Sequence, residues 1–212
     1  MLLKFNELYT KYNLEIKSVI HIGAHHGQEV HLYKEVGASD IILFEPSPAN
    51  FFILEQLHGE KCELYKLALG NENKKIKMNV EATNKGQSNS ILEPKLHLSQ
   101  YPHIVFNDKI EVDMVTLDDF MTIYNARPEN KNKKYNFINI DVQGYELEVF
   151  KGSKETLKNI DYIIAEVNRD FVYEGCAQVE EIDSFLDQFG FKRAETNWEG
   201  GTWGDAFYIK IR

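Results

Sequence analysis

Short apolar runs alternate along the chain with segments in which apolar residues recur every three or four positions. The runs predict strands, and the segments between them predict helices. The strands are expected at residues 18–22, 40–46, 62–70, 135–144 and 161–167. This alternation is typical of βαβ units, in which parallel strands form a central sheet and helices cover both of its faces.

The C-terminal part of the chain adds a helix and two further strands. Residues 178–190 have helical spacing and end at Gly190, and the predicted strands 191–198 and 204–212 are joined by the short sequence EGGT. So tight a connection favours an antiparallel hairpin. We therefore predict an α/β fold with a seven-stranded, mostly parallel sheet whose last strand is antiparallel.

The pattern changes between the third and fourth of these strands. Residues 74–80 and 110–117 alternate like antiparallel strands, whereas residues 83–109 are irregular and contain Gly86, Pro94 and Pro102. A loop of this length inside a compact domain is usually functional or disordered. We expect one domain over residues 1–212, with an N-terminal helical extension (1–17) and an insertion (71–135) that carries extra strands and a substrate-side loop.

Composition narrows the class of protein. The net charge of −9 argues against a nucleic-acid partner, and the lysines at 74–77 and 131–134 are interpreted as solvated loops. No secretory signal and no apolar run long enough for a membrane span is present. Cys62 and Cys176 are far apart in sequence, so neither a disulfide framework nor a zinc site is indicated. A cytoplasmic location fits these features.

The turn after the first strand, in VIHIGAHHGQE (residues 19–29), is the first candidate for chemistry. A dinucleotide fingerprint needs further glycines where His25 and Gln28 stand, so an NAD-dependent oxidoreductase is disfavoured. Glu45 ends the second strand, 22 residues after Gly23. A carboxylate there can accept hydrogen bonds from both hydroxyls of a ribose. These features indicate a nucleoside without a pyrophosphate, such as S-adenosylmethionine; the alternative is a surface carboxylate before a helix that starts with proline.

Several motifs in order resemble the FkbM family of S-adenosylmethionine-dependent methyltransferases. They are VIHIGAHHGQE, LFEPSP, LALGNENKKIKM, GQSNSIL, VTLDDF and NIDVQGYELEVFKGS, and they span about residues 18–168. The resemblance implies the class I methyltransferase fold, which is Rossmann-like, and O-methylation, often of sugars in glycans or natural products. Many relatives carry an acidic residue at the position of His21, where it helps to hold the methionine ammonium. A neutral imidazole attracts a cation less.

The expected cofactor-binding residues follow from these motifs and from the strand ends. They are His21, Gly23, Ala24, His25, Gly27, Glu45, Pro46, Ala68, Ser88, Asp141 and Gln143. The adenine is expected near Leu67 and Ala68. A metal cluster of the histidines at 21, 25 and 26 is the alternative, but no further ligand stands at suitable spacing.

The chemistry is expected where the fourth and fifth strands end. Asp141 and Glu166 are the candidate catalytic residues, because a sugar hydroxyl needs a base or a metal to lose its proton. Asp141, Glu166 and Asn168 also present three oxygens that could bind Mg²⁺. Glu146 and Glu148 are interpreted as capping, solvent-facing charges.

Aromatic residues near the same edge indicate the acceptor. Tyr173 follows the fifth strand, and Trp198 and Trp203 flank the last hairpin turn. Aromatic faces bind the C–H faces of sugars, although each ring could equally belong to the core. We therefore expect an O-methyltransferase for a carbohydrate acceptor. The alternative is a non-catalytic S-adenosylmethionine-binding module of a glycan-assembly system.

Overall fold

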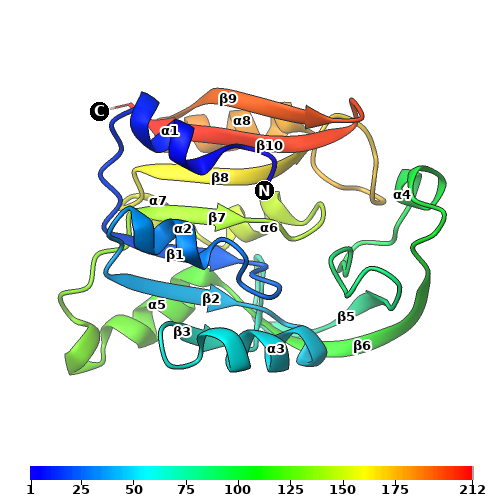
Figure 1. Ribbon diagram of the computed structural model, residues 1–212, viewed down its shortest axis with the longest axis horizontal. Coiled ribbons are helices and arrows are strands. Elements are labelled where there is room, and N and C mark those ends of the chain that lie inside the picture. The colour runs from blue at the N-terminus through cyan, green and yellow to red at the C-terminus, as the bar shows by residue number, and fades with distance from the viewer. Residues whose placement is uncertain (212) are drawn as a thin grey trace.

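The computed structural model describes residues 1–211, and its centre is a seven-stranded sheet (Figure 1). The strand order is β3-β2-β1-β7-β8-β10-β9. The strands are β1 (Ser18–Ile22), β2 (Asp40–Phe44), β3 (Glu63–Tyr65), β7 (Phe137–Ile140), β8 (Tyr162–Asn168), β9 (Phe191–Glu199) and β10 (Trp203–Lys210). The first five in this order are parallel, and β10 is antiparallel to both of its neighbours. The predicted sheet is confirmed; Arg212, the last residue of the predicted final strand, lies outside the described residues.

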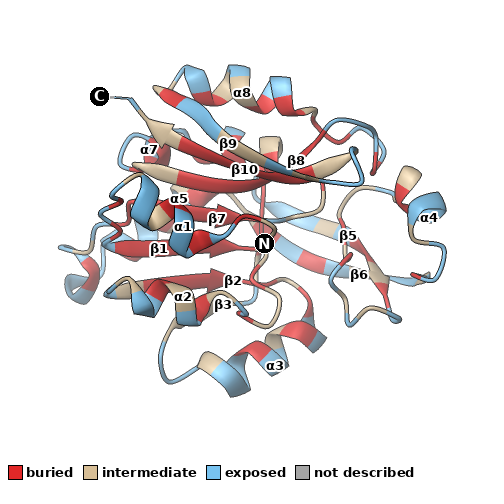
Figure 2. Ribbon diagram, turned by 45° about the horizontal axis from the view of Figure 1, so that its top comes forward, coloured by how far each residue is buried: buried red, intermediate tan, exposed pale blue. Residues whose placement is uncertain are grey.

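Helices cover both faces of this sheet, so its central strands are buried on both sides. Val19 of β1 packs with α1 (Phe5–Lys11), α2 (Val30–Glu35) and α3 (Pro48–His58), while Ile20 and Ile22 face the opposite layer. That layer contains α5 (Leu117–Asn125), α6 (Glu146–Lys151), α7 (Lys154–Leu157) and α8 (Val179–Asp187). Figure 2 shows the buried residues concentrated along the strands between the two layers. No helix within residues 1–211 is long and apolar enough to cross a membrane.

A second, three-stranded sheet lies beyond the carboxyl ends of the parallel strands (Figure 1). It contains β4 (Ala68–Leu69), β5 (Lys74–Glu81) and β6 (Phe106–Val115), in the order β4-β6-β5. The expected antiparallel pair is confirmed as β5 and β6. The segment between them, which was expected to be irregular, also holds a short helix, α4 (Leu96–Gln100).

Two predicted elements are divided in the structure, and the two divisions lie against each other. The predicted strand 62–70 separates into β3 in the main sheet and β4, which pairs with Met114 and Val115 of β6. The helix expected after Gly144 breaks at Gly152 into α6 and α7. A Cβ at position 152 would lie 2.0 Å from the carbonyl oxygen of Gly70. The chain after β4 therefore passes directly against the break between the two helices.

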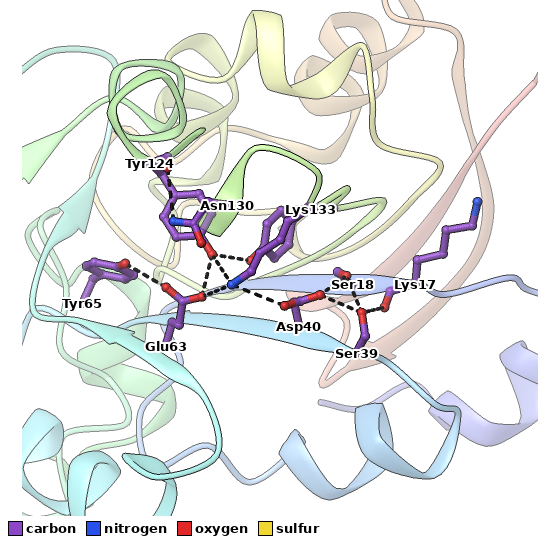
Figure 3. Close-up of polar contacts among 10 residues, drawn as sticks. Lys17, Ser18, Ser39, Asp40, Glu63, Tyr65, Tyr124, Asn130 and Lys133 are labelled. Carbon is purple, nitrogen blue, oxygen red and sulfur yellow. Dashed lines mark hydrogen bonds and ion pairs between the residues drawn. The ribbon is translucent and has the colours of Figure 1, made fainter. Parts of the chain in front are cut away.

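Lys133 connects the amino ends of β2 and β3 at the edge opposite to these carboxyl ends (Figure 3). Its Nζ lies 2.6 Å from Oε1 of Glu63 and 3.4 Å from Oδ1 of Asp40. The hydroxyl of Tyr124 also donates to Glu63, at 2.6 Å. Lys133 lies in a loop, as expected, but its side chain is only 24% exposed and is therefore less solvated than the sequence indicated. Lys131, two residues earlier, is exposed.

We predict that Lys133→Met lowers the free energy of unfolding by about 1 to 2 kcal/mol, because it leaves a half-buried carboxylate without its cation. Urea unfolding at 25 °C measures the change. The matched control is Lys131→Met, which should stay within about 0.5 kcal/mol of wild type. Equal effects of the two substitutions would contradict a stabilising role for the Lys133 contacts.

Candidate functional site

A cavity of about 640 Å³ opens where β1, β2, β7 and β8 end. Cavities of this size are typical of small-molecule sites, and the carboxyl ends of parallel strands are their usual place. The predicted site residues that line it are His21, Gly23, Ala24, His25, Glu45, Pro46, Ala68, Ser88, Asp141, Gln143 and Glu166. Gly27 and Asn168 lie outside this lining. Gly27 instead packs against His58, which a Cβ at position 27 would approach to 2.6 Å.

The floor of the cavity is the turn that begins at Gly23. The N–H groups of Gly23 and Ala24 both donate to the carbonyl of Phe44, at 3.0 and 2.9 Å. Gly23 has a φ of +77°, and a Cβ there would lie 1.8 Å from the carbonyl oxygen of Asp141. Only glycine permits this approach. The turn after β1 and the exit of β7 are therefore in direct backbone contact.

Glu45 lies beside this turn and is held by two backbone donors. Its Oε2 accepts from the N–H of His25 and its Oε1 from the N–H of Ser47, both at 2.9 Å. Burial raises the pKa of Glu45 to about 7, although the two N–H groups favour the ionised form. Each carboxylate oxygen accepts more than one hydrogen bond, so both can still bind donors from a ligand.

His21 belongs to a polar cluster on the strand itself rather than to a metal site. Its Nδ1 lies 3.2 Å from the hydroxyl of Tyr33, and its Nε2 lies 3.3 Å from the side-chain nitrogen of Asn139. Burial lowers the pKa of His21, which favours the neutral imidazole. His25 and His26 instead stack on each other with ring centroids 3.7 Å apart.

Three carboxylates gather where β7 and β8 end. Ligand atoms of Asp141, Glu146 and Glu166 all lie within 4.8 Å of one another, with Asp141 exposed and the other two buried. The interpretation of Glu146 as solvent-facing was wrong: its Oε1 accepts from the N–H groups of Val142 and Gly144, at 2.9 and 3.2 Å. Burial raises the pKa of Glu146, and that of Glu166 well above its ordinary value. Burial therefore disfavours the charged form of the two enclosed carboxyl groups.

Gln143 lies between two of these carboxylates. Its Nε2 donates to Oδ1 of Asp141 at 2.7 Å and to Oε2 of Glu166 at 3.0 Å. Asn168, the third predicted metal ligand, is fully buried, and its amide has no hydrogen-bond partner among residues 1–211. The site thus combines the side-chain amide of Gln143 with three carboxylates. Two of these, Asp141 and Glu166, were predicted from the sequence.

The far wall of the cavity comes from segments that are distant in sequence. Nε1 of Trp203 donates to the hydroxyl of Tyr101 at 2.8 Å, and Nε2 of His97 lies 3.1 Å from Oγ of Ser88. Both Trp203 and Tyr101 line the cavity, whereas Trp198 lies outside the lining and stacks on Arg169. Tyr173 is fully buried, so it offers no open ring face.

Polar residues of the lining that were missed from the sequence include Glu29, His97 and Asp205. Asp205 pairs across the sheet with Glu166, and its position inside the apolar run of β10 is a signal that could have identified it. His97 stands in a segment without a regular pattern, and Glu29 precedes a helix as many surface carboxylates do. Neither position carries a signal in the sequence alone.

Comparisons with known proteins place the chain among methyltransferases. The Methyltransferase FkbM domain matches residues 21–193. The chain is 27% identical over 179 residues to the 2-O-methyltransferase NoeI of Sinorhizobium fredii (strain NBRC 101917 / NGR234), a match that covers 81% of this chain and 71% of NoeI.

Solved structures resemble it in fold at lower identity. Magnesium protoporphyrin IX methyltransferase (ChlM) from Synechocystis PCC 6803, solved with bound SAM, matches with a TM-score of 0.53 and 12% identity over 98% of this chain and 76% of ChlM. The ribosomal protein L11 methylase of Lactobacillus delbrueckii subsp. bulgaricus matches with a TM-score of 0.50 and 10% identity, over 98% and 77% of the two chains.

The sheet order and these neighbours define a class I methyltransferase fold. Because the domain match spans most of the sequence, the chain belongs to the FkbM methyltransferase family.

Proposed function

We propose that the protein is an S-adenosylmethionine-dependent O-methyltransferase that methylates a sugar hydroxyl. The observation that carries this proposal is the cavity, which has a buried carboxylate for a ribose at one end and an exposed carboxylate for proton transfer beside it. Membership of the FkbM family and the name of its relative NoeI support methyl transfer to oxygen.

The residues of the cavity fit the cofactor. Glu45 keeps free lone pairs for the two ribose hydroxyls, and Ala68 and Leu67 offer apolar surface for an adenine. Gly23 and Ala24 line the cavity, so the methionine part can lie over the turn. Glu29 lines the cavity, and its Oε1 lies 3.5 Å from the N-terminal ammonium of Met1, so in the proposed complex this carboxylate would bind the methionine ammonium in place of that partner. ChlM, which shares the fold, binds SAM.

S-adenosylmethionine, when bound, supplies a methyl group attached to a positively charged sulfur. Methyl transfer then requires an aligned acceptor oxygen and a group that takes its proton. Asp141 is the carboxylate that can do so, because it is exposed to the cavity while Glu146 and Glu166 are buried, with raised pKa values. In the proposed reaction Asp141 accepts the proton as the acceptor oxygen is methylated.

The far wall fits a sugar. Trp203 and Tyr101 present aromatic surface, while Ser88, Asn89 and His97 present hydrogen-bonding groups to the same space. Aromatic faces that bind C–H groups, together with polar groups that bind hydroxyls, are what a carbohydrate ring requires.

The residues predicted to bind Mg²⁺ do not fit a cation well. Gln143 directs N–H groups at both Asp141 and Glu166, where a cation needs free lone pairs, and the raised pKa of Glu166 favours its protonated form. We therefore assign no step to a metal ion.

The binding of S-adenosylhomocysteine should weaken as the pH falls through 7, because ribose hydroxyls donate more strongly to ionised Glu45 and the pKa of that group is about 7. Titration calorimetry at pH 8 and pH 6 should show up to about a tenfold loss for wild type. Glu45→Gln should bind about 10- to 100-fold more weakly at pH 8 and vary less with pH. Undiminished affinity of Glu45→Gln for S-adenosylhomocysteine would refute the proposed contact between Glu45 and the ribose.

Asp141→Asn should lower kcat by about 10²- to 10⁴-fold and leave the affinity for S-adenosylhomocysteine within about threefold, because it removes a proton acceptor and keeps its shape. The assay uses labelled S-adenosylmethionine and a panel of methyl hexosides, with product mass as the readout. Glu174→Gln, an exposed carboxylate outside the cavity lining, is the control and should match wild type. Excess EDTA should not change the wild-type rate.

Full turnover in Asp141→Asn would contradict the role of Asp141 as the base. Inhibition by EDTA would support a mechanism that depends on a metal ion. Cofactor binding without methylation of any acceptor would instead favour the non-catalytic module.

A further inference from the structure

Gln143 occupies an unusual place in the carboxylate cluster. It follows Asp141 by two residues, has a φ of +54°, and points its amide nitrogen at both Asp141 and Glu166. A positive φ is uncommon for residues other than glycine, and such positions cluster at functional sites. The backbone of this loop is held in place, because Glu146 accepts hydrogen bonds from the N–H groups of Val142 and Gly144.

The orientation of the Gln143 amide is determined by its partners. The Asp141 carboxylate accepts from one end, which is therefore the nitrogen, and the hydroxyl of Tyr173 donates to Oε1 at 2.5 Å. An amide turned by 180° would place its oxygen against two carboxyl groups and its N–H groups against the tyrosine. Tyr173 therefore supports the one orientation that is favourable for Asp141.

Tyr173 itself has little freedom to move. Its ring is fully buried and lies 5.4 Å from the ring of His97, measured between centroids. Its backbone forms a bridge with Pro94, and the neighbouring Val172 carbonyl accepts from the N–H groups of Lys95 and His97. The hydroxyl of Tyr173 is thus held in place by the same segment that forms the far wall of the cavity.

We propose that Gln143, oriented by Tyr173, is a positioning residue that holds the Asp141 carboxylate beside the acceptor site. This inference rests on the proposed function, in which Asp141 accepts the acceptor's proton. The amide donates to Oδ1 of Asp141, and Asp141 is exposed enough to adopt another rotamer once this hydrogen bond is removed. Tyr173 acts one step further away, through the amide.

The first test measures position and needs no acceptor. Crystal structures of wild type and Gln143→Met, each with S-adenosylhomocysteine, compare the Asp141 rotamer, since methionine keeps the length of glutamine and removes its N–H groups. We expect Asp141 to bind Gln143 in wild type and to leave that place in the variant. An unchanged Asp141 in Gln143→Met would overturn the inference.

The second test separates turnover from binding, with methyl hexosides as acceptors. Gln143→Met should lower kcat by about 10- to 100-fold and Tyr173→Phe by about tenfold, with the KM for S-adenosylmethionine within about threefold. Tyr124→Phe is the matched control, because it also removes a buried hydroxyl, but one bound to Glu63 far from the cavity. It should lower the melting temperature and leave kcat unchanged.

The outcomes distinguish this inference from the function on which it rests. One outcome is that Asp141→Asn loses turnover while Gln143→Met and Tyr173→Phe keep the wild-type kcat. This outcome would refute the positioning role of Gln143 and leave Asp141 as the base. Full turnover in Asp141→Asn would refute the base itself. If Gln143→Met does not fold, the conservative Tyr173→Phe variant still decides, by the same crystallographic and kinetic readouts.

Discussion

The contact between the turn after β1 and the end of β7 sets the geometry of the whole site. A side chain at Gly23 would collide with the carbonyl of Asp141, so the two backbones can lie side by side only with glycine at this position. The turn carries the surface proposed for the cofactor, and Asp141 carries the proposed base. One backbone contact therefore fixes the separation between the group that would be transferred and the group that would accept a proton.

The carboxyl groups around the cavity differ in burial, and this difference determines their proposed roles. Glu45 is enclosed and held by two N–H groups, Glu146 supports the loop of Gln143, and Glu166 is enclosed beside Asp141. Desolvation disfavours charge on each of these buried groups. Asp141, which is exposed, is left as the carboxylate suited to proton transfer.

The sequence predicted the parts of this site that depend on single strands. Glu45 and Asp141 follow apolar runs, and in a parallel sheet such positions meet at one edge, so both could be placed at the cavity from pattern alone. Glu146 could not, because its burial depends on a loop with two positive φ angles, at Gln143 and Gly144. The division of the predicted strand 62–70 depends on pairing with β6, which is about 45 residues away. The roles of His97 and Lys133 likewise depend on tertiary contacts that no local pattern encodes.

The most direct measurement is a crystal structure of the protein with S-adenosylhomocysteine. We predict that both ribose hydroxyls lie within hydrogen-bond distance of Glu45 and that the sulfur faces Asp141 across the turn at Gly23. A ribose that contacts other groups, or a sulfur directed away from Asp141, would contradict the proposed geometry.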